Sequence, residues 1–380
     1  MVRGVYKHVL IAVSLLCTTI ISAYAEPGIT ATKITLGQSA PFTGPIGTYG
    51  IQLRDGANVY FESVNNAGGI NGRKIELFSL DDGYEEERAV ANTKKLIEAN
   101  DVFCLFGYYG TASTTAAMKV FSAAKVPLFS TISGAASLRT PVNRYMFNLR
   151  ASYADETGAI VTQLTSLGMK NIAVFYQNDG FGLAGLDGVK VALKKHGLSP
   201  SAIGIVERNS QEVSEAVKEI AKVNPQAVVM VTLYKPTAEF VRQMKAAGKN
   251  PQFITLSPVS TDLLAKELGA DSRGIGVSQV MPYPWTTGTP LAKEYNALAK
   301  QFSKSGISYY GIEGFAAAKV LVEALRKTGK EPTREKLIAA LESMTAYDVG
   351  GFQLTYSPTN HSGSKFTELT VIGKDGKVMR

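Results

Sequence analysis

The sequence is poor in cysteine and histidine, with two cysteines and three histidines in 380 residues. Cys17 lies in an N-terminal apolar run, so a chain cleaved after that run keeps only Cys104 and cannot form an internal disulfide. We expect Cys104 to be a small core residue of an apolar strand. His196 and His361 are far apart in the sequence, which argues against a zinc site of the usual type.

Common catalytic motifs are also missing. The sequence has no G-x-S-x-G elbow, no G-x-x-x-x-G-K-[ST] loop and no H-E-x-x-H pair. The motifs therefore predict no enzyme, no metal and no cofactor, although carboxylates remain available as general bases. Lys and Arg are spread along the chain without an arginine-rich tract, so we expect no nucleic-acid partner.

The N-terminus has the pattern of a secretory signal peptide. Arg3 and Lys7 precede a short apolar run at residues 9–21, and small residues follow at Ala23 and Ala25. The run is too short for a typical membrane span, and Cys17 lacks the small preceding residue of a lipid-anchored cysteine. We expect cleavage after Ala25, which would lower the net charge from +8 to +6; an uncleaved anchor is the alternative.

Strands and helices alternate along the rest of the chain, and this alternation predicts an α/β protein. The rhythm β-α-β-α-β restarts near residue 150, which indicates two doubly wound, Rossmann-like lobes. Strands are predicted at 33–40, 74–80, 102–106, 127–132, 171–176, 202–206, 227–233, 253–256 and 274–284, with short strands after 350. Helices are predicted at 51–67, 85–99, 111–125, 154–167, 185–196, 213–223, 238–247, 290–303, 310–328 and 333–344. Residues 41–50 are expected to form a loop.

The stretch from Val102 to Val120 reads as a strand, a glycine turn and a helix. Thr111 and Ser113 fall in the first helical turn, where unpaired backbone N–H groups and the helix dipole favour a carboxylate or phosphate. Ordinary capping of the helix without a ligand is the alternative.

Ligands of parallel sheets bind outside the carboxyl ends of the strands. Phe181, Tyr234 and Ser257 follow three such ends in the second lobe, and Thr111 follows one in the first. The arrangement predicts a cleft between two lobes that close on a small molecule.

The motifs Gly44-Pro45, Tyr49-Gly50, GGINGRKIEL (68–77) with Asp81-Asp82, Gly107 to Thr114, VPLFST (126–131), Asp179 to Gly182 and Glu313-Gly314 occur in this order. With this order and spacing the chain resembles the periplasmic solute-binding proteins of branched-chain amino acid (leucine/isoleucine/valine) type ABC importers. The resemblance covers essentially the whole chain after the leader. It implies a three-strand hinge, with one lobe at 26–148 and 283–344 and the other at 149–282 and 345–380.

The resemblance also implies a ligand site. The ligand carboxylate would bind at the start of the helix after the third strand and in the loop 130–134. Aromatic rings would wall the side-chain pocket, the alternative being that they pack in the core. The implied residues are Tyr49, Thr111, Ser113, Ser133, Gly134, Phe181, Tyr234, Ser257 and Tyr310.

One position departs from the family pattern. Amino-acid binders commonly carry a glutamate where this chain has Ser257, and a buried ammonium without an acid partner is costly. Glu313 or Asp179 would be substitutes, although a solvated or capping Glu313 and a surface Arg150 at the hinge are the favoured interpretations. A hydrophobic or aromatic carboxylate without an amine is therefore an open alternative. Gly134 also stands where amino-acid binders often have a threonine, so backbone N–H groups and Ser133 are left to bind the carboxylate.

The expected function is that of a monomeric periplasmic receptor that performs no chemistry. It would capture a small hydrophobic amino acid or related carboxylate and deliver it to an ABC permease in the inner membrane. A periplasmic sensor domain that signals to a membrane receptor is the alternative.

Overall fold

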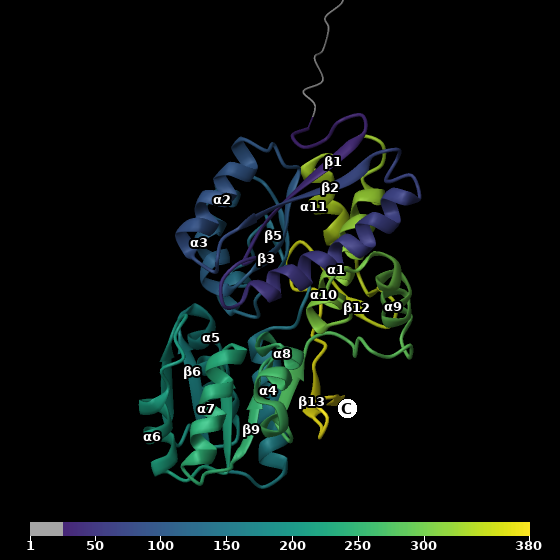
Figure 1. The fold of residues 1–380 in the computed structure, drawn as a ribbon. Coiled ribbons are helices and arrows are strands. Elements are labelled where there is room, and N and C mark those ends of the chain that lie inside the picture. Colours follow the sequence, from purple (N-terminus) through teal and green to yellow (C-terminus); the bar gives the residue numbers. More distant parts are fainter. Residues whose placement is uncertain (1–25) are drawn as a thin grey trace, which may run out of the picture.

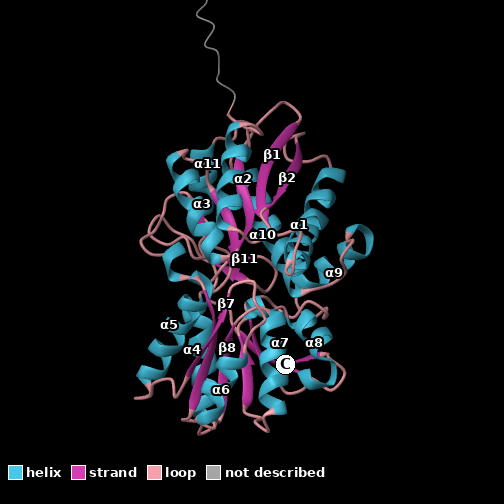
Figure 2. Cartoon of the chain, turned by 60° about the vertical axis from the view of Figure 1, so that its left-hand side comes forward, coloured by secondary structure: helices cyan, strands magenta, loops and turns pink. Residues whose placement is uncertain are grey.

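The computed structural model describes residues 26–380; the predicted leader and its cleavage site lie outside this range. Two α/β lobes are stacked along the long axis of the molecule (Figure 1). Each has a central sheet with helices on both faces (Figure 2). The predicted fold class is confirmed. None of the helices within 26–380 is both long and apolar enough to cross a membrane.

The first lobe is built on a five-stranded parallel sheet of order β2-β1-β3-β4-β5. Every residue of β3 and β4 is buried, as expected for central strands covered on both faces. The strands are β1 (Lys33–Ala40), β2 (Lys74–Asp81), β3 (Cys104–Tyr109), β4 (Leu128–Ile132) and β5 (Met146–Phe147).

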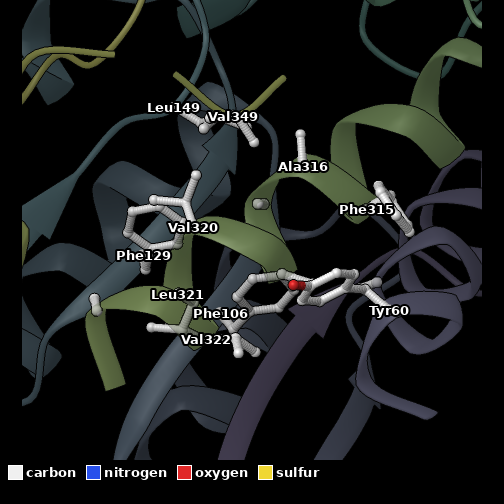
Figure 3. Close-up of a cluster of buried hydrophobic side chains, with 14 of the residues drawn as sticks. Tyr60, Phe106, Phe129, Leu149, Phe315, Ala316, Val320, Leu321, Val322 and Val349 are labelled. Carbon is white, nitrogen blue, oxygen red and sulfur yellow. The ribbon is translucent and has the colours of Figure 1, made fainter. Parts of the chain in front are cut away.

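Helices cover both faces of this sheet. Leu96 of α2 (Glu86–Glu98) and Phe121 of α3 (Thr111–Ala123) pack on one face. The other face carries α1 (Gly47–Asn66), α9 (Pro290–Phe302), α10 (Tyr309–Lys327) and α11 (Arg334–Glu342). In Figure 3 the ring of Phe129 lies beside Val320 of α10, and the ring of Phe106 lies next to that of Tyr60 of α1. Cys104 is buried in the same core, as predicted.

The second lobe has a seven-stranded sheet of order β14-β13-β10-β9-β8-β6-β7. Only the pairs of β13 with β10 and with β14 are antiparallel. The strands are β6 (Ile172–Asn178), β7 (Ile203–Glu207), β8 (Ala227–Val231), β9 (Gln252–Thr255), β10 (Gly276–Gln279), β13 (Glu368–Ile372) and β14 (Val378–Met379).

Five helices sandwich this second sheet. One face carries α4 (Tyr153–Ser166) and α5 (Gly180–Lys195). The other carries α6 (Ser214–Lys222), α7 (Tyr234–Ala246) and α8 (Thr261–Leu268). Short 3-10 helices lie at η1 (Ala136–Leu138), η2 (Ser257–Val259) and η3 (Gly269–Ser272).

The chain passes between the two sheets after β5, after β10 and before β13. The last passage follows the hairpin β11 (Tyr347–Asp348) and β12 (Gln353–Leu354). Side chains of this hairpin region, such as Phe352 and Tyr356, belong to the first lobe's core, whereas β13 and β14 complete the second sheet (Figure 1). The predicted residue bounds of the lobes stay a prediction.

Three helices of the cleft begin earlier than predicted. α1 begins at Gly47 instead of residue 51, α5 at Gly180 instead of 185, and α7 at Tyr234 instead of 238. Glycine disfavours helix, so the glycines at the starts of α1 and α5 favour a loop there. Here it permits close backbone approach: a Cβ added at Gly182 would lie 1.7 Å from the carbonyl oxygen of Gln177.

The strand β3 also extends further than predicted, to Tyr109 instead of residue 106. Gly107 therefore lies within the strand, at a positive φ of 62°, and not in the turn. Gly110, with φ of 89°, makes the turn into α3 alone. The longer strand carries Tyr109 to the edge of the sheet that faces the second lobe.

Candidate functional site

A cluster of tyrosines lies where the two lobes meet. The Tyr49 ring stacks on that of Tyr310 with centroids 4.9 Å apart, and it lies 5.7 Å from Tyr109 and 5.9 Å from Tyr234. Tyr49 comes from α1, Tyr109 from β3 and Tyr310 from α10 of the first lobe, whereas Tyr234 begins α7 of the second. Aromatic groups from separate elements thus converge at the interlobe cleft.

The hydroxyls of this cluster bridge the lobes. Tyr49 donates to the carbonyl oxygen of Val259 at 2.7 Å, and Tyr310 to that of Pro258 at 3.0 Å. Both carbonyls belong to η2 in the second lobe. Tyr234 in turn donates to the carbonyl of Pro45 in the first lobe at 3.2 Å. The tyrosine hydroxyls therefore form hydrogen bonds across the cleft, while the rings form its apolar walls.

The start of α3 has the geometry predicted for it. Thr111 and Ser133 are buried, and their hydroxyls are 2.7 Å apart. The Ser113 hydroxyl is buried without a hydrogen-bond partner among residues 26–380. Across the cleft, Gly180 at the start of α5 lies against Thr111, since an added Cβ would be 3.5 Å from Cγ2 of Thr111. The structure thus brings hydroxyls to a helix start that faces the other lobe.

Gly134 stands where the family pattern has a threonine, and the packing explains why. A Cβ added at Gly134 would lie 2.4 Å from Cδ1 and 2.5 Å from the backbone nitrogen of Tyr153. The carbonyl of Gly134 accepts a hydrogen bond from that same nitrogen at 2.8 Å. Tyr153, the first residue of α4, therefore fills the space that a larger residue at 134 would need.

This contact leads to a prediction for Gly134→Thr. Overpacking a well-filled site costs about 1–3 kcal/mol, so we expect the free energy of unfolding to fall by that amount in urea denaturation. Because the overlap is partly with the Tyr153 ring, Gly134→Thr should cost less in a Tyr153→Ala background. Equal losses in both backgrounds would show that the ring is not the obstacle.

The second lobe contributes Phe181, whose ring centroid lies 5.3 Å from that of Tyr153. Phe181 follows the N-cap Asp179, whose carboxylate accepts from the backbone nitrogens of Phe181 at 2.9 Å and Gly182 at 3.0 Å. The same carboxylate accepts from the Tyr84 hydroxyl of the first lobe at 3.2 Å. Asp179 is therefore a cap and an interlobe contact.

Residues 180–185 (GFGLAG), the first six residues of α5, match the spacing G-x-G-x-x-G shortly after β6. In dinucleotide-binding proteins the helix N–H groups after such a turn hold a pyrophosphate. Here the Asp179 carboxylate already occupies those groups and adds negative charge. The local chemistry does not fit a dinucleotide.

A buried group of charged residues lies at the hinge end of the cleft. Arg150 follows β5 and is 1% exposed, so the interpretation as a surface charge is wrong. Glu313 on α10 is 3% exposed, so the solvated or capping interpretation is wrong too. Nε of Arg150 lies 3.5 Å from Oε1 of Glu313. Both line a small cavity with Tyr310 and Ser257.

Ser257 connects this pair to a second carboxylate, Glu156 of α4. Arg150 donates from Nη2 to the Ser257 hydroxyl, which donates to Oε1 of Glu156 at 3.0 Å. The backbone nitrogen of Ser257 donates to Oε2 of Glu156 at 2.8 Å, and the Ser278 hydroxyl donates to the same oxygen. Ser257 thus links the cation Arg150 to the acid Glu156, and both of these residues lie within residues 150–156.

Burial dominates the titration of these groups. Desolvation raises the pKa of Glu313 to about 7 and also raises that of Glu156. Burial alone would lower the pKa of Arg150, but the carboxylates of Glu313 and Glu156 outweigh it and raise that pKa. Arg150 is therefore a permanent cation, whereas Glu313 titrates near neutral pH.

Most of the predicted site residues lie at the cleft, although nothing in the structure tests whether they touch a ligand. Tyr49, Thr111, Ser113, Ser133, Phe181 and Tyr310 are buried there, and Tyr234 and Ser257 are partly buried. Gly134 lies behind Tyr153. Sequence reasoning missed the residues that complete the cluster, namely Tyr84, Tyr109, Arg150, Tyr153, Glu156 and Ser278.

Comparison with known proteins identifies the family. The sequence matches the family model described as periplasmic binding protein over residues 33–377. The chain belongs to the periplasmic binding protein family. An amino acid binding protein of Pseudomonas aeruginosa is 26% identical over 295 residues, which cover 75% of this chain and 78% of that protein.

Solved structures agree with this membership. A possible leucine/isoleucine/valine-binding protein from Rhodopirellula baltica has a TM-score of 0.88 at 30% identity, covering 92% of this chain and 97% of that one. A substrate-binding periplasmic protein from Ralstonia solanacearum has a TM-score of 0.87 at 34% identity, with 91% and 99% covered. The predicted resemblance is confirmed, and the cleft of this periplasmic binding protein carries the tyrosines and the buried charges described above.

Proposed function

We propose that this periplasmic binding protein is the substrate-binding component of an ABC importer. It would capture a small hydrophobic amino acid or related carboxylate in the interlobe cleft and deliver it, as a monomer, to an inner-membrane permease. It would be exported by a signal peptide cleaved after Ala25 and would perform no chemistry. Its lobes would be 26–148 with 283–344 and 149–282 with 345–380.

The observation that carries this proposal is the convergence of polar and aromatic groups from both lobes on one buried cleft. A helix start with hydroxyls, at Thr111, Ser113 and Ser133, suits a carboxylate. Aromatic rings at Tyr49, Phe181, Tyr234 and Tyr310 suit an apolar side chain. The names of the relatives, which include an amino acid binding protein, point to the same class of ligand.

Thermal unfolding of residues 26–380 tests the proposal. The panel holds the twenty common amino acids and their amine-free counterparts, such as 4-methylpentanoate for leucine and 3-phenylpropanoate for phenylalanine. A ligand that binds only the folded chain at 100 times its Kd adds about 2.7 kcal/mol to stability, and the melting temperature should rise accordingly.

A matched control locates the site. Tyr310→Ala, which removes a cleft wall, should abolish the shift, whereas Tyr347→Ala, on the β11 hairpin away from the cleft, should leave it intact. If no member of the panel raises the melting temperature, the proposed function is overturned. If the shift survives Tyr310→Ala, the cleft is not where the ligand binds.

A further inference from the structure

Glu313 differs from Glu156 and Asp179 because no hydrogen bond reaches its carboxylate from residues 26–380. Its Oε1 is buried without a donor within residues 26–380, and its one ion-pair contact is with Nε of Arg150 at 3.5 Å. Glu156, by contrast, accepts from the Ser257 nitrogen, the Ser257 hydroxyl and the Ser278 hydroxyl. Asp179 is satisfied by backbone nitrogens. Of these three acids, Glu313 is the one with a buried carboxylate oxygen that accepts no hydrogen bond from the described residues.

The buried charged groups at the hinge end of the cleft are incompletely hydrogen-bonded. Arg150 is the cation shared by two buried carboxylates, directly for Glu313 and through the Ser257 hydroxyl for Glu156. Arg139, the next cation, donates to the backbone carbonyls of Ser133 and Arg150 and forms no ion pair among the described residues. Buried charges are stable only when paired and hydrogen-bonded. Nε and Nη1 of Arg150 and Nε of Arg139 are buried without acceptors within residues 26–380, so the two cations of the group still leave Oε1 of Glu313 without a donor.

Glu313 is also placed to meet a ligand. It lies one helical turn after Tyr310 on α10, and the two residues line the same cavity at the cleft. With the lobes in contact the cavity has room for little more than one water molecule. A ligand therefore reaches Glu313 only after the lobes separate. Hinge closure would then enclose the ligand between the lobes.

We propose that Glu313 holds the cationic amine of the ligand, so that this site selects amine-bearing carboxylates over acids that lack the amine. Arg150 is the residue that positions Glu313. The inference rests on the proposed function, and it assigns to α10 the acid that position 257 does not supply. An ammonium brings three N–H donors and a positive charge. An amine-free acid brings neither and would leave Glu313 without a donor.

The two ligand classes should also differ in proton linkage. The pKa of Glu313 is about 7, so part of the free protein carries a proton there at pH 7. A bound ammonium favours the carboxylate and lowers this pKa, so binding should release a proton and tighten as pH rises from about 6 to 8. The other groups facing Glu313 are Arg150, Arg139, Glu156 and Tyr310. Among these groups Glu156 is the second carboxyl, and burial raises its pKa as well.

Isothermal titration calorimetry with matched ligand pairs tests the inference. The pairs are leucine with 4-methylpentanoate and phenylalanine with 3-phenylpropanoate, extended to any panel member that stabilises the protein. Removing one partner of a buried charge pair costs at least about 2 kcal/mol, so the amine-bearing member should bind at least about 30-fold more tightly. Glu313→Gln should remove that preference, while the amine-free acid keeps its affinity or gains some.

The control is Glu323→Gln, the same change on the partly exposed face of the same helix, which should alter neither affinity. If Glu313→Gln does not fold, calorimetry of the unaltered chain at pH 7 in phosphate and in Tris still decides, because it counts the protons released. Equal affinities within a pair, an unchanged preference in Glu313→Gln, or proton uptake with the amine-bearing ligand would overturn the inference. Tight binding of amine-free acids alone would overturn it and leave the proposed function standing, whereas binding of no panel member overturns the proposed function itself.

Discussion

Replacing Arg150 with methionine should lower the free energy of unfolding at pH 7 by about 3–5 kcal/mol, the usual cost of removing one member of a buried ion pair. The guanidinium is 1% exposed and lies 3.5 Å from Glu313. Methionine fills the space of the aliphatic part of the arginine side chain but carries no charge. Glu313 and Glu156 therefore stay buried without the Arg150 guanidinium. Urea unfolding measures the loss through the fluorescence of Trp285, the single tryptophan, which packs against Tyr309.

The loss should depend on pH in a defined direction. Without Arg150 the folded-state pKa of both carboxyls lies further above the unfolded value of 4.5, so protonation favours the folded state. Such a group contributes its full stability below the unfolded pKa, and that contribution is lost as pH rises through the folded pKa. The difference between the variant and the unaltered protein should therefore be small near pH 4.5 and largest at and above pH 7.

A double variant separates charge from packing. Arg150→Met combined with Glu313→Gln removes a cation and an anion together, so it should recover much of the stability that Arg150→Met loses. Lys304→Met, which removes an exposed cation of the first lobe, should stay within about 0.5 kcal/mol of the unaltered protein. A loss below about 1 kcal/mol for Arg150→Met, or no recovery in the double variant, would contradict the account of a buried cation that serves two acids.

The fold was predictable because its signal is local and repeated. Apolar runs such as residues 227–231 and amphipathic stretches such as 86–98 alternate through both lobes, and a parallel sheet with helices on both faces follows from that alternation. The element starts were less predictable. Gly47 and Gly180 lower local helix propensity, yet their helices begin there because tertiary contacts outweigh propensity.

Part of the aromatic wall of the cleft was predictable, whereas its charged part was not. Tyr49, Phe181 and Tyr234 stand next to strand ends or helix starts, positions that topology alone brings to the cleft. Arg150 carries no such signal, since a lone arginine between two elements is usually exposed. Its burial depends on Glu156 six residues later and on Glu313 in a helix far along the chain. Long-range pairing of this kind leaves no local pattern in one sequence.

The contact between α1 and α10 should make Gly56 intolerant of any side chain. A Cβ added at Gly56 would lie 1.9 Å from the carbonyl oxygen of Gly311, and one added at Gly314 would lie 2.1 Å from that of Leu53. The obstacle is backbone in both cases, so no rotamer change can relieve it and the helices must move apart. We expect Gly56→Ala to lower the free energy of unfolding by about 3 kcal/mol, at the upper end of overpacking costs.

The matched control has the opposite sign. Gly158 lies inside α4, and a Cβ added there meets no atom within 4 Å. Alanine in a helix interior is about 0.5–1 kcal/mol more favourable than glycine, so Gly158→Ala should stabilise the protein in the same urea assay. If Gly56→Ala is also stabilising, the backbone contact is not as close as the structure has it.

The same substitution should weaken ligand binding. Tyr49 lies on α1, and Tyr310 and Glu313 lie on α10, so separating the two helices shifts the aromatic wall and the buried acid together. Such shifts loosen the fit of a preorganised site, and affinity for the panel ligand that binds best should fall in Gly56→Ala while Gly158→Ala keeps it. Loss of stability with unchanged affinity would mean that the two helices support the lobe without setting the geometry of the cleft. Loss of both stability and affinity would show that the close packing of α1 on α10 keeps the binding residues of the first lobe aligned with those of the second lobe.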